Sequence, residues 1–216
     1  MQVIAETGST NADLLAAAAG GAPDRSVLAA RHQTAGRGRL DRTWEAPPGA
    51  NLLVSLLFRD VPDEPHEPTQ RVALAALAVA RRCGVDAAIK WPNDLLAADG
   101  KLAGILAQSQ HGCVVVGVGM NVGWAPPGAA KLGGDHDPLD VLAALLLAYD
   151  DLPDDVHEAY RQHLSTLGAK VRVELPGGVV EGRAIDIEAD GRLVVLDACG
   201  ITHRLSTGDV VHLRRR

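Results

Sequence analysis

The segment HQTAGRGRLDRTW, residues 32–44, concentrates positive charge in a chain whose formal net charge is −6. Its cations are Arg37, Arg39 and Arg42, and the first two alternate with Gly36 and Gly38. Guanidinium groups pair with carboxylates and phosphates, and glycines at positive φ can turn backbone N–H groups toward an anion. The segment therefore predicts an anion-binding loop, with a solvated basic turn as the alternative. It matches neither the GxxxxGK[ST] phosphate loop nor the GxGxxG dinucleotide fingerprint.

A second polar segment, KWPND, places Lys90, Asn93 and Asp94 around a bend that Pro92 stiffens. Polar groups fixed in this way suit a binding site better than groups on a flexible loop do. The alternative is a hairpin edge with Trp91 packed on the core.

Three further positions could carry chemistry. Lys101 follows an Asp-Gly turn and precedes the apolar run LAGILA, so its ammonium group could point into a cleft, although most turn lysines are solvated. Asn121 ends an apolar strand, where its amide could read a purine edge or form an Asx turn. Ser9, Thr10 and Asn11 are most simply a helix cap, and such a helix start also suits a polar ligand group.

The spacing of apolar residues predicts the helices that must position these groups. A capping box at residues 10–13 predicts a helix that ends at Gly20 or Gly21. Residues 68–84 predict a helix with Thr69 as its cap and Gly84 as its stop. Two more helices are predicted, one starting with Pro138 in its first turn and one over residues 153–168.

Strands are predicted between these helices by short apolar runs. They cover residues 26–32, 50–58 and 113–123, together with a hairpin over residues 88–108 that turns at Asp-Gly. This order of hairpins and helices favours an α+β fold over a regular βαβ array.

Beyond Gly168 the pattern changes to short alternating strands separated by glycine-containing turns. About 48 residues of this kind are too few for a sandwich and predict a small β-barrel. We therefore expect two domains, residues 1–168 and residues 169–216, joined without a flexible linker.

Composition limits the function further. The chain has 216 residues, 47% of them hydrophobic, with no apolar run long enough for a membrane span. Its start lacks the zones of a signal peptide, so we expect a cytoplasmic protein. Cys83, Cys113 and Cys199 lack the spacing of a disulfide framework or a zinc site. The acidic net charge argues against general nucleic-acid binding.

Taken in order, the motifs ST-N, Q-x-AGRGR-xxR-x-W, GANL, KWPND, K-L-AGIL and G-x-G-x-NV resemble those of the biotin protein ligase family. The resemblance is dense over residues 7–121, and the segments from KVRVELPGG to VVHLR resemble more loosely that family's C-terminal barrel of the Src-homology-3 type. It implies an α+β catalytic domain, with a mixed sheet packed against helices as in class II aminoacyl-tRNA synthetases. The implied activity makes biotinyl-5′-AMP from biotin and ATP and then transfers biotin to a lysine of biotin carboxyl carrier protein.

The resemblance also implies roles for individual residues. The implied biotin-binding residues are Ser9, Thr10, Asn11, Gln33, Gly36, Arg37, Gly38, Arg39, Lys101 and Gly104. The implied ATP and adenylate residues are Arg39, Arg42, Trp44, Asn51, Asn93, Lys101 and Asn121. Lys101 would neutralise charge at the acyl phosphate, Arg39 would bridge the biotin carboxylate and the α-phosphate, and Asp94 would lie near the carrier amine. Mg²⁺ would be held through the phosphates, with Asp94 as a candidate ligand.

Some features depart from the family pattern. The chain begins almost at the ST-N motif, so we expect neither an N-terminal winged-helix domain nor DNA binding. Asp41 replaces a usual glycine and could pair with Arg39 or Arg42. Residues 123–138 are few where the family covers the adenylate. We expect residues 35–41 to be mobile until the adenylate binds, and the protein to be a monomer or a weak homodimer.

Two alternative functions remain open. A lipoate ligase or octanoyl transferase belongs to the same superfamily, and a transferase mechanism would need a cysteine in the cleft, for which Cys113 is a weak candidate. A non-catalytic nucleotide or nucleic-acid binding module would need a wide basic face, and the net acidity counts against it.

Overall fold

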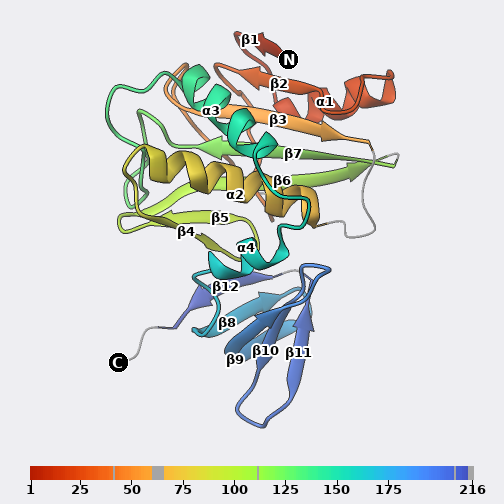
Figure 1. Ribbon diagram of the computed structural model, residues 1–216, viewed down its shortest axis with the longest axis vertical. Coiled ribbons are helices and arrows are strands. Elements are labelled where there is room, and N and C mark those ends of the chain that lie inside the picture. The colour runs from red at the N-terminus through yellow and green to blue at the C-terminus, as the bar shows by residue number, and fades with distance from the viewer. Residues whose placement is uncertain (41, 60–65, 111, 207, 214–216) are drawn as a thin grey trace.

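The computed structural model describes residues 1–216 except residues 41, 60–65, 111, 207 and 214–216. Within the described residues the strands form a seven-stranded sheet and a five-stranded sheet, which lie at opposite ends of the molecule (Figure 1). The larger sheet packs against long helices and the smaller one does not. The expected α+β organisation is confirmed.

The seven-stranded sheet is mixed and has the order β1-β2-β3-β7-β6-β5-β4. β1 and β2 pair in parallel, and the other neighbours pair antiparallel. Its strands are β1 (Gln2–Ile4), β2 (Val27–Ala30), β3 (Leu52–Phe58), β4 (Ala87–Lys90), β5 (Asp94–Ala97), β6 (Gly100–Gln110) and β7 (Cys113–Met120). The sequence predicted β2, β3 and β7 but missed β1, which is too short to show a periodic pattern.

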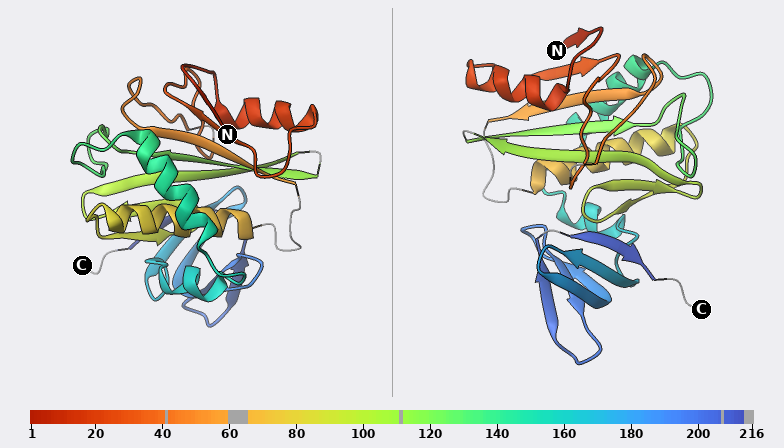
Figure 2. Two further views of the ribbon diagram at one scale, coloured as in Figure 1. Left: turned by 45° about the horizontal axis from the view of Figure 1, so that its top comes forward. Right: turned by 180° about the vertical axis from the view of Figure 1, so that it is seen from behind.

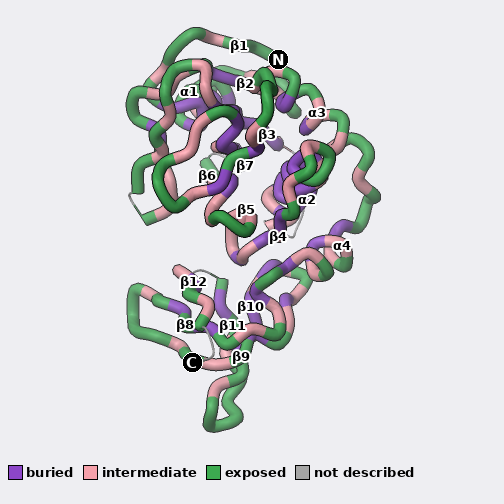
Figure 3. The backbone as a smooth tube through the Cα atoms, turned by 90° about the vertical axis from the view of Figure 1, so that its left-hand side faces the viewer, coloured by how far each residue is buried: buried purple, intermediate pink, exposed green. Residues whose placement is uncertain are grey.

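Helices cover both faces of this sheet. They are α1 (Thr10–Ala19), α2 (Glu67–Arg82), α3 (Pro138–Asp150) and α4 (His157–Gln162). Leu56 of β3 lies in the main core, which includes α2 and α3, whereas the next residue, Leu57, packs with Leu14 of α1 in a smaller core. Because neighbouring strand residues point to opposite faces, α1 lies on the face opposite α2 (Figure 2). Buried positions follow the central strands and the inner side of α2 (Figure 3).

The start of α1 differs from the predicted capping box. Ser9 is the N-cap residue, and Thr10 lies inside the helix, where its backbone N–H and its hydroxyl group are both next to Gln33 Oε1. Asp13 accepts a hydrogen bond from the Thr7 hydroxyl. The capping-box prediction is therefore wrong, because these polar side chains make tertiary contacts instead.

The other long helices follow the sequence more closely. α2 is present, but its cap is His66 and not Thr69, because the helix begins earlier with Pro68 in its first turn. Gly84 follows the helix with a φ of 79°, as expected for a helix stop. α3 starts at Pro138 as predicted.

The predicted hairpin over residues 88–108 is in fact two hairpins. The chain turns at KWPND between β4 and β5, and turns again at Asp-Gly between β5 and β6. Lys90 and Asp94 therefore lie opposite each other across the first turn, which contains a cis Trp91–Pro92 peptide.

The last predicted helix is shorter than expected. α4 covers only His157–Gln162, because the residues after it pair with the edge strand β4. Ile89 N donates to the His163 carbonyl oxygen at 2.9 Å, and Ser165 N donates to the Ile89 carbonyl oxygen at 2.8 Å. This pairing holds the chain beside the KWPND turn just before the C-terminal strands begin.

The C-terminal strands form an antiparallel sheet of order β11-β10-β9-β8-β12. They are β8 (Lys170–Leu175), β9 (Gly178–Ile187), β10 (Leu193–Leu196), β11 (Thr202–Leu205) and β12 (Asp209–His212). The small β domain expected from the alternating pattern is confirmed, and the exact boundary at Gly168 stays a prediction. In the described part of the chain, no helix combines the length and apolar character needed to cross a membrane.

Candidate active site

Two adjoining cavities lie where the segment of residues 32–44, called here the arginine loop, meets the KWPND turn and β6. The outer cavity has a volume of about 330 Å³ and the inner cavity about 50 Å³. Five residues line both: Gly38, Arg39, Trp44, Asn93 and Lys101. This shared wall contains Arg39 and Lys101, the two residues predicted to contact both substrates, together with Gly38 from the biotin set and Trp44 and Asn93 from the adenylate set.

Most of the predicted site residues line one of these cavities. The inner cavity adds the predicted biotin residues Ser9, Thr10, Asn11, Gln33, Arg37 and Gly104. The outer cavity adds Arg42, Asp94 and Asn121. Of the predicted residues, Gly36 and Asn51 line neither cavity.

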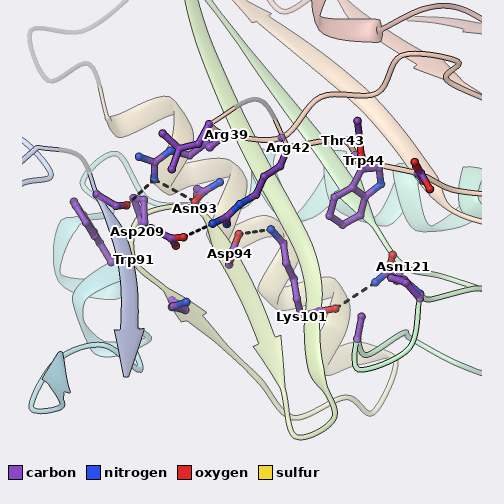
Figure 4. Close-up of a pocket in the computed structure, with 18 of the residues that line it drawn as sticks. Arg39, Arg42, Thr43, Trp44, Trp91, Asn93, Asp94, Lys101, Asn121 and Asp209 are labelled. Carbon is purple, nitrogen blue, oxygen red and sulfur yellow. Dashed lines mark hydrogen bonds and ion pairs between the residues drawn. The ribbon is translucent and has the colours of Figure 1, made fainter. Parts of the chain in front are cut away.

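Lys101 reaches the junction of the cavities because the pairing of β5 with β6 is irregular. Residues 101 and 104 would point to opposite faces of a regular strand. The register shifts after Leu95, and a Cβ on Gly104 would lie 3.1 Å from Lys101 Nζ, so both residues point to one face. Lys101 Nζ forms an ion pair with Asp94 Oδ1 at 2.6 Å (Figure 4). An ammonium group carries three protons, so donors remain for a ligand carboxylate or phosphate.

Trp44 separates the two cavities and depends on glycines for its place. A Cβ on Gly119 would lie 2.6 Å from Trp44 Nε1, and one on Gly104 would lie 3.2 Å from its Cζ3. Lys101 Nζ lies 5.6 Å from the centroid of the indole ring, within reach of a cation–π contact. The Trp44 N–H is buried and has no acceptor among the described residues, so a ligand oxygen would satisfy it.

Arg39 and Arg42 reach the outer cavity from the loop and contact the C-terminal sheet. Arg39 Nη1 lies 3.4 Å from Asn93 Oδ1 and 3.3 Å from the Gly208 carbonyl oxygen, while Arg42 forms an ion pair with Asp209 (Figure 4). Burial lowers the pKa of the Arg39 guanidinium, and neighbouring carboxylates oppose this effect. Arginine nevertheless stays charged at neutral pH. The outer cavity therefore has two permanent cations in its wall.

The sequence predicted that backbone N–H groups of this loop form an anion nest, and this prediction is wrong. Neither Gly36 nor Gly38 is among the glycines with positive φ, and the Gly38 N–H already donates to the Arg42 carbonyl at 2.6 Å. Trp44 N donates to the Gly36 carbonyl oxygen at 3.0 Å, so the loop folds back on itself. Glycine is required at position 36 because a Cβ there would collide with the Trp44 carbonyl. The predicted pairing of Asp41 falls outside the described residues.

The polar groups of the inner cavity come from α1 and from the segment after β2. Thr10 N donates to Gln33 Oε1 at 2.7 Å. Asn11 Nδ2 donates to the Leu106 carbonyl oxygen at 3.1 Å and to Gln108 Oε1 at 2.8 Å. The Asn11 amide is therefore engaged by the protein, and Thr10 with Gln33 is better placed to meet a ligand.

Asn51 and Asn121 are both 2% exposed and are bonded mainly to the protein. Asn51 Oδ1 accepts from Trp124 N at 3.2 Å, and its Nδ2 donates to Asn121 Oδ1 at 3.2 Å. Asn121 Nδ2 donates to the carbonyl oxygens of Lys101 and Ala130 at 3.2 and 2.9 Å. These amides fix the segment after β7 beside the outer cavity, and their direct contact with adenine stays a prediction.

Several residues that line the outer cavity had been given no substrate role from the sequence. They are Leu40, Thr43, Glu45, Lys90, Trp91, Pro92, Trp124, Pro126, Ala129, Gly208 and Asp209. Most of them lie in or beside a quoted motif, so position in the chain was a usable signal. Asp209 begins β12 and Gly208 directly precedes it, and nothing in the sequence around them distinguishes them from other glycine-containing segments of the C-terminal region.

The side chains around the outer cavity do not fit a magnesium site held by protein alone. The described residues contain no group of three His, Cys, Asp or Glu side chains that could hold a metal. Asp94 pairs with Lys101, and Asp209 pairs with Arg42. Mg²⁺ prefers six oxygen ligands, so nucleotide phosphates and water would have to supply most of them.

Two family models match the sequence. Residues 6–124 match the Biotin/lipoate A/B protein ligase family, and residues 166–213 match the Biotin protein ligase C terminal domain. Together the two ranges contain the shared wall of the cavities and the contacts from Gly208 and Asp209.

Curated relatives agree with this match. The "Biotin--[acetyl-CoA-carboxylase] ligase" of Mycobacterium tuberculosis is 44% identical over 239 residues, which cover 99% of this chain and 89% of that protein. The "Bifunctional ligase/repressor BirA" of Bacillus subtilis is 30% identical and is matched over 81% of this chain and 62% of its own length.

Solved structures share the fold. "Biotin protein ligase from Aquifex aeolicus in complex with biotin and ATP" has a TM-score of 0.78 at 24% identity and covers 99% of this chain and 98% of that one. A Leishmania major biotin protein ligase in complex with Biotinyl-5-AMP has a TM-score of 0.67 at 26% identity and covers 95% and 98%. With a family match over more than half of its length and a relative matched almost end to end, this chain belongs to the biotin/lipoate protein ligase family, as a biotin protein ligase.

Proposed function

We propose that this chain activates biotin with ATP and transfers it to a lysine of the biotin carboxyl carrier protein of acetyl-CoA carboxylase. The observation that carries the proposal is the shared wall, because Arg39, Trp44 and Lys101 line both cavities. A ligase of this kind must bring the carboxylate of one substrate to the α-phosphate of the other. The ligands named for the solved relatives, biotin with ATP and Biotinyl-5-AMP, support the same two substrates.

In the first step a biotin carboxylate oxygen attacks the α-phosphorus of ATP. The new O–P bond gives biotinyl-5′-AMP, and the bond to pyrophosphate breaks. Both reactants are anions, so fixed positive charge at their meeting point lowers their repulsion and stabilises the charge that develops. Lys101 and Arg39 supply this charge, Arg42 holds the phosphates that leave, and Trp44 packs beside the adenylate.

In the second step the amine of the carrier lysine attacks the acyl carbon of the adenylate. An amide bond forms, AMP leaves with one oxygen of the original carboxylate, and the amine loses a proton. Asp94 is the proposed acceptor of this proton, with Asn93 beside it, because a carboxylate within reach of the amine can act as a general base. The ion pair with Lys101 orients the Asp94 carboxylate at the junction of the cavities.

The remaining partners follow from this reaction. Magnesium would enter with ATP as the partner of its phosphates, with Asp94 as a candidate ligand. We further propose that the protein acts as a monomer or a weak homodimer. The use of ATP and of a carrier protein supports a cytoplasmic location.

Lipoate or octanoate transfer is the second candidate, because the family that matches residues 6–124 includes lipoate ligases. The match of residues 166–213 to the biotin protein ligase C-terminal domain favours biotin. A transferase mechanism would also need a cysteine in the cleft. Cys113 lines neither cavity, and its thiol donates to the Gln110 carbonyl oxygen at 2.9 Å.

The proposal is tested by incubating the protein with MgATP, an isolated biotin carboxyl carrier domain and either biotin, lipoate or octanoate. Mass spectrometry should find biotin on a single carrier lysine, only when ATP is present. A carrier with that lysine replaced by arginine is the control and should stay unmodified. Absence of biotin transfer, or preferred transfer of lipoate or octanoate, would contradict the proposed function.

A further inference from the structure

Ser55 is a polar residue in the middle of the apolar strand β3, LLVSLLF, and it is 0% exposed. It lines neither cavity and has no role in the reaction described above. Its hydroxyl oxygen lies 2.7 Å from Thr10 Oγ1 and 2.6 Å from Asn11 Oδ1. A buried hydroxyl group in such a strand needs partners, and its partners here belong to the inner cavity.

The orientation of the Asn11 amide is fixed by its other contacts. Its Nδ2 lies beside the Leu106 carbonyl oxygen and Gln108 Oε1, both of which only accept hydrogen bonds. Asn11 Oδ1 must therefore face Ser55. Gly117 makes room for this arrangement, because a Cβ there would collide with Asn11 Oδ1. Since an amide oxygen only accepts, the single Ser55 proton is donated to Asn11.

The side-chain oxygens of Asn11, Ser55, Thr10 and Gln33 form a chain of close contacts, called here the chain of oxygens. It has one hydroxyl proton fewer than it has contacts. Three close oxygen pairs follow one another: Asn11 with Ser55 at 2.6 Å, Ser55 with Thr10 at 2.7 Å, and Thr10 with Gln33 Oε1 at 2.9 Å. The two hydroxyl groups supply only two protons for these three contacts. With the Ser55 proton donated to Asn11, the Thr10 proton has two possible acceptors, the Ser55 oxygen at 2.7 Å and Gln33 Oε1 at 2.9 Å. It is assigned to Ser55, because Gln33 Oε1 already accepts from the Thr10 backbone N–H and the Ser55 oxygen is the closer of the two. The contact between Thr10 and Gln33 is then left without a hydroxyl proton.

This shortage makes the part of the inner cavity formed by Thr10 and Gln33 rich in acceptors. Gln33 Oε1 keeps one donor, the backbone N–H of Thr10, and the oxygens of Thr10 and Gln33 both belong to residues that line the cavity. A ligand that brings an N–H group supplies the missing donor, whereas an apolar head group leaves two acceptors facing each other.

We propose that Ser55 is a positioning residue that sets the specificity of the inner cavity by directing the Thr10 proton away from Gln33. The cavity then selects a head group with an N–H donor, as in a cyclic urea, over one without, as in an alkyl chain or a dithiolane. This inference rests on the proposed function, because the ureido ring of biotin is the N–H group in question.

Replacing Ser55 with alanine should reverse the direction of the Thr10 proton. Without the Ser55 oxygen, the Thr10 hydroxyl donates to Gln33 and fills the position that the ligand N–H would take. In biotin-dependent exchange of pyrophosphate into ATP, Ser55→Ala should raise the KM for biotin about tenfold, the scale of one lost hydrogen bond. The KM for ATP and kcat should change less than about twofold, because neither depends on this contact.

A double-variant cycle separates positioning from general loss of packing. In a Thr10→Val background the Thr10 proton is absent, so adding Ser55→Ala should change the KM for biotin less than about twofold. Val115→Ala is the matched control, because Val115 is 0% exposed in the small core on the same face and its apolar side chain cannot hydrogen-bond to these oxygens. It should lower the melting temperature and leave the KM for biotin unchanged.

The inference is overturned if Ser55→Ala leaves the KM for biotin unchanged, if it raises that KM equally in the Thr10→Val background, or if Val115→Ala raises it as much. If Ser55→Ala does not fold, Ser55→Cys keeps the volume, weakens the hydrogen bonds and should shift the KM for biotin in the same direction. An unmodified protein that catalyses no biotin-dependent exchange would instead contradict the proposed function itself.

Discussion

Lys101 is the side chain on which the proposed chemistry depends most. It lines both cavities, pairs with Asp94 and lies beside the Trp44 ring. A cation fixed at the point where two anions meet stabilises the transition state more than it stabilises either substrate.

Replacing Lys101 with alanine should therefore slow formation of biotinyl-5′-AMP by on the order of 10²-fold or more, as for other preorganised charge stabilisers. Single-turnover release of pyrophosphate measures this step directly. Lys170→Ala is the matched control, since Lys170 is exposed in β8, away from both cavities, and should keep the unmodified rate. A Lys101→Ala protein with that same rate would remove Lys101 from the catalytic machinery.

At the scale of single residues, the sequence predicted which side chains lie near the site but not which contacts they make there. Lys101, Arg39 and Asp94 line the same outer cavity, and their roles in the reaction stay predictions. Asn51 forms a structural amide pair with Asn121 instead of lining a cavity, and Gly36 is needed for close packing and not for positive φ. These differences depend on neighbours that fold in from other segments.

The arginine loop is the element whose order should respond most to ligand. Among its described residues, backbone hydrogen bonds run from Gly38 to Arg42, from Arg42 to Arg39 and from Trp44 to Gly36. The side chains of Arg37 and Arg42 are exposed. Like charges this close repel one another until an anion lies between them.

We predict that residues 35–40 are mobile without ligand and become ordered over the adenylate. Asp41, the last residue of the range expected from the sequence, lies outside the described residues. Trypsin should cleave after Arg37 and Arg39 several-fold more slowly when biotinyl-5′-AMP is bound, because a closed loop does not fit the protease. Cleavage at Arg183, in the C-terminal sheet, serves as the internal control. Equal rates of loop cleavage with and without the adenylate would contradict this prediction.

A second element, α4, is tied to the C-terminal sheet by an exposed ion pair. Arg161 Nε donates to Asp186 Oδ1 at 2.8 Å, and this hydrogen bond lowers the pKa of the Asp186 carboxyl below its ordinary value. A carboxyl whose folded pKa is depressed stabilises the fold above its unfolded pKa of about 3.9 and loses that contribution as pH falls through the folded value.

The melting temperature of Asp186→Asn should therefore lie slightly below that of the unmodified protein at neutral and mildly acidic pH, and the gap should begin to narrow only below the unfolded pKa of about 3.9 and close as pH falls through the depressed pKa of the folded Asp186 carboxyl. Scanning calorimetry over this range measures the gap. Glu181→Gln, which removes a looser pair at 3.5 Å from Arg172, is the control with a smaller effect. A gap that widens in acid would exclude the Arg161 contact as its cause.

At the scale of elements, helical periodicity predicted α2 and α3, and alternation predicted the C-terminal strands. The sequence failed where tertiary contacts override local pattern. Thr10 contacts Gln33 instead of capping α1, and the residues after α4 pair with β4 instead of extending the helix. Neither contact can be predicted from the spacing of apolar residues.

At the scale of the whole molecule, the C-terminal sheet forms part of the outer cavity. Gly208 and Asp209 line it and contact Arg39 and Arg42, and the Gly191 carbonyl accepts from Trp91 Nε1 in the KWPND turn at 3.0 Å. The sheet therefore touches the site from two sides. Local sequence patterns could not predict these contacts, because Asp209 and Arg42 lie far apart along the chain.

Replacing Asp209 with asparagine should weaken the anchoring of Arg42 and raise the KM for ATP a few-fold, with little change in the KM for biotin. The effect is small because an exposed ion pair contributes at most about 1 kcal/mol. Steady-state adenylation kinetics measure both constants. Glu174→Gln, an exposed carboxylate in β8 outside the cavities, should change neither, and an equal rise in both constants for Asp209→Asn would contradict a specific role at the phosphates.

The central claim is that the biotin carboxylate attacks the α-phosphate of ATP at the junction of the two cavities and that the carrier amine then attacks the acyl carbon. The most direct test supplies biotin labelled with oxygen-18 in its carboxylate, together with ATP and the carrier domain, and measures the mass of each phosphorus product. We predict one labelled oxygen in AMP and none in pyrophosphate. Label in pyrophosphate or phosphate, or biotin transfer without labelled AMP, would contradict the account.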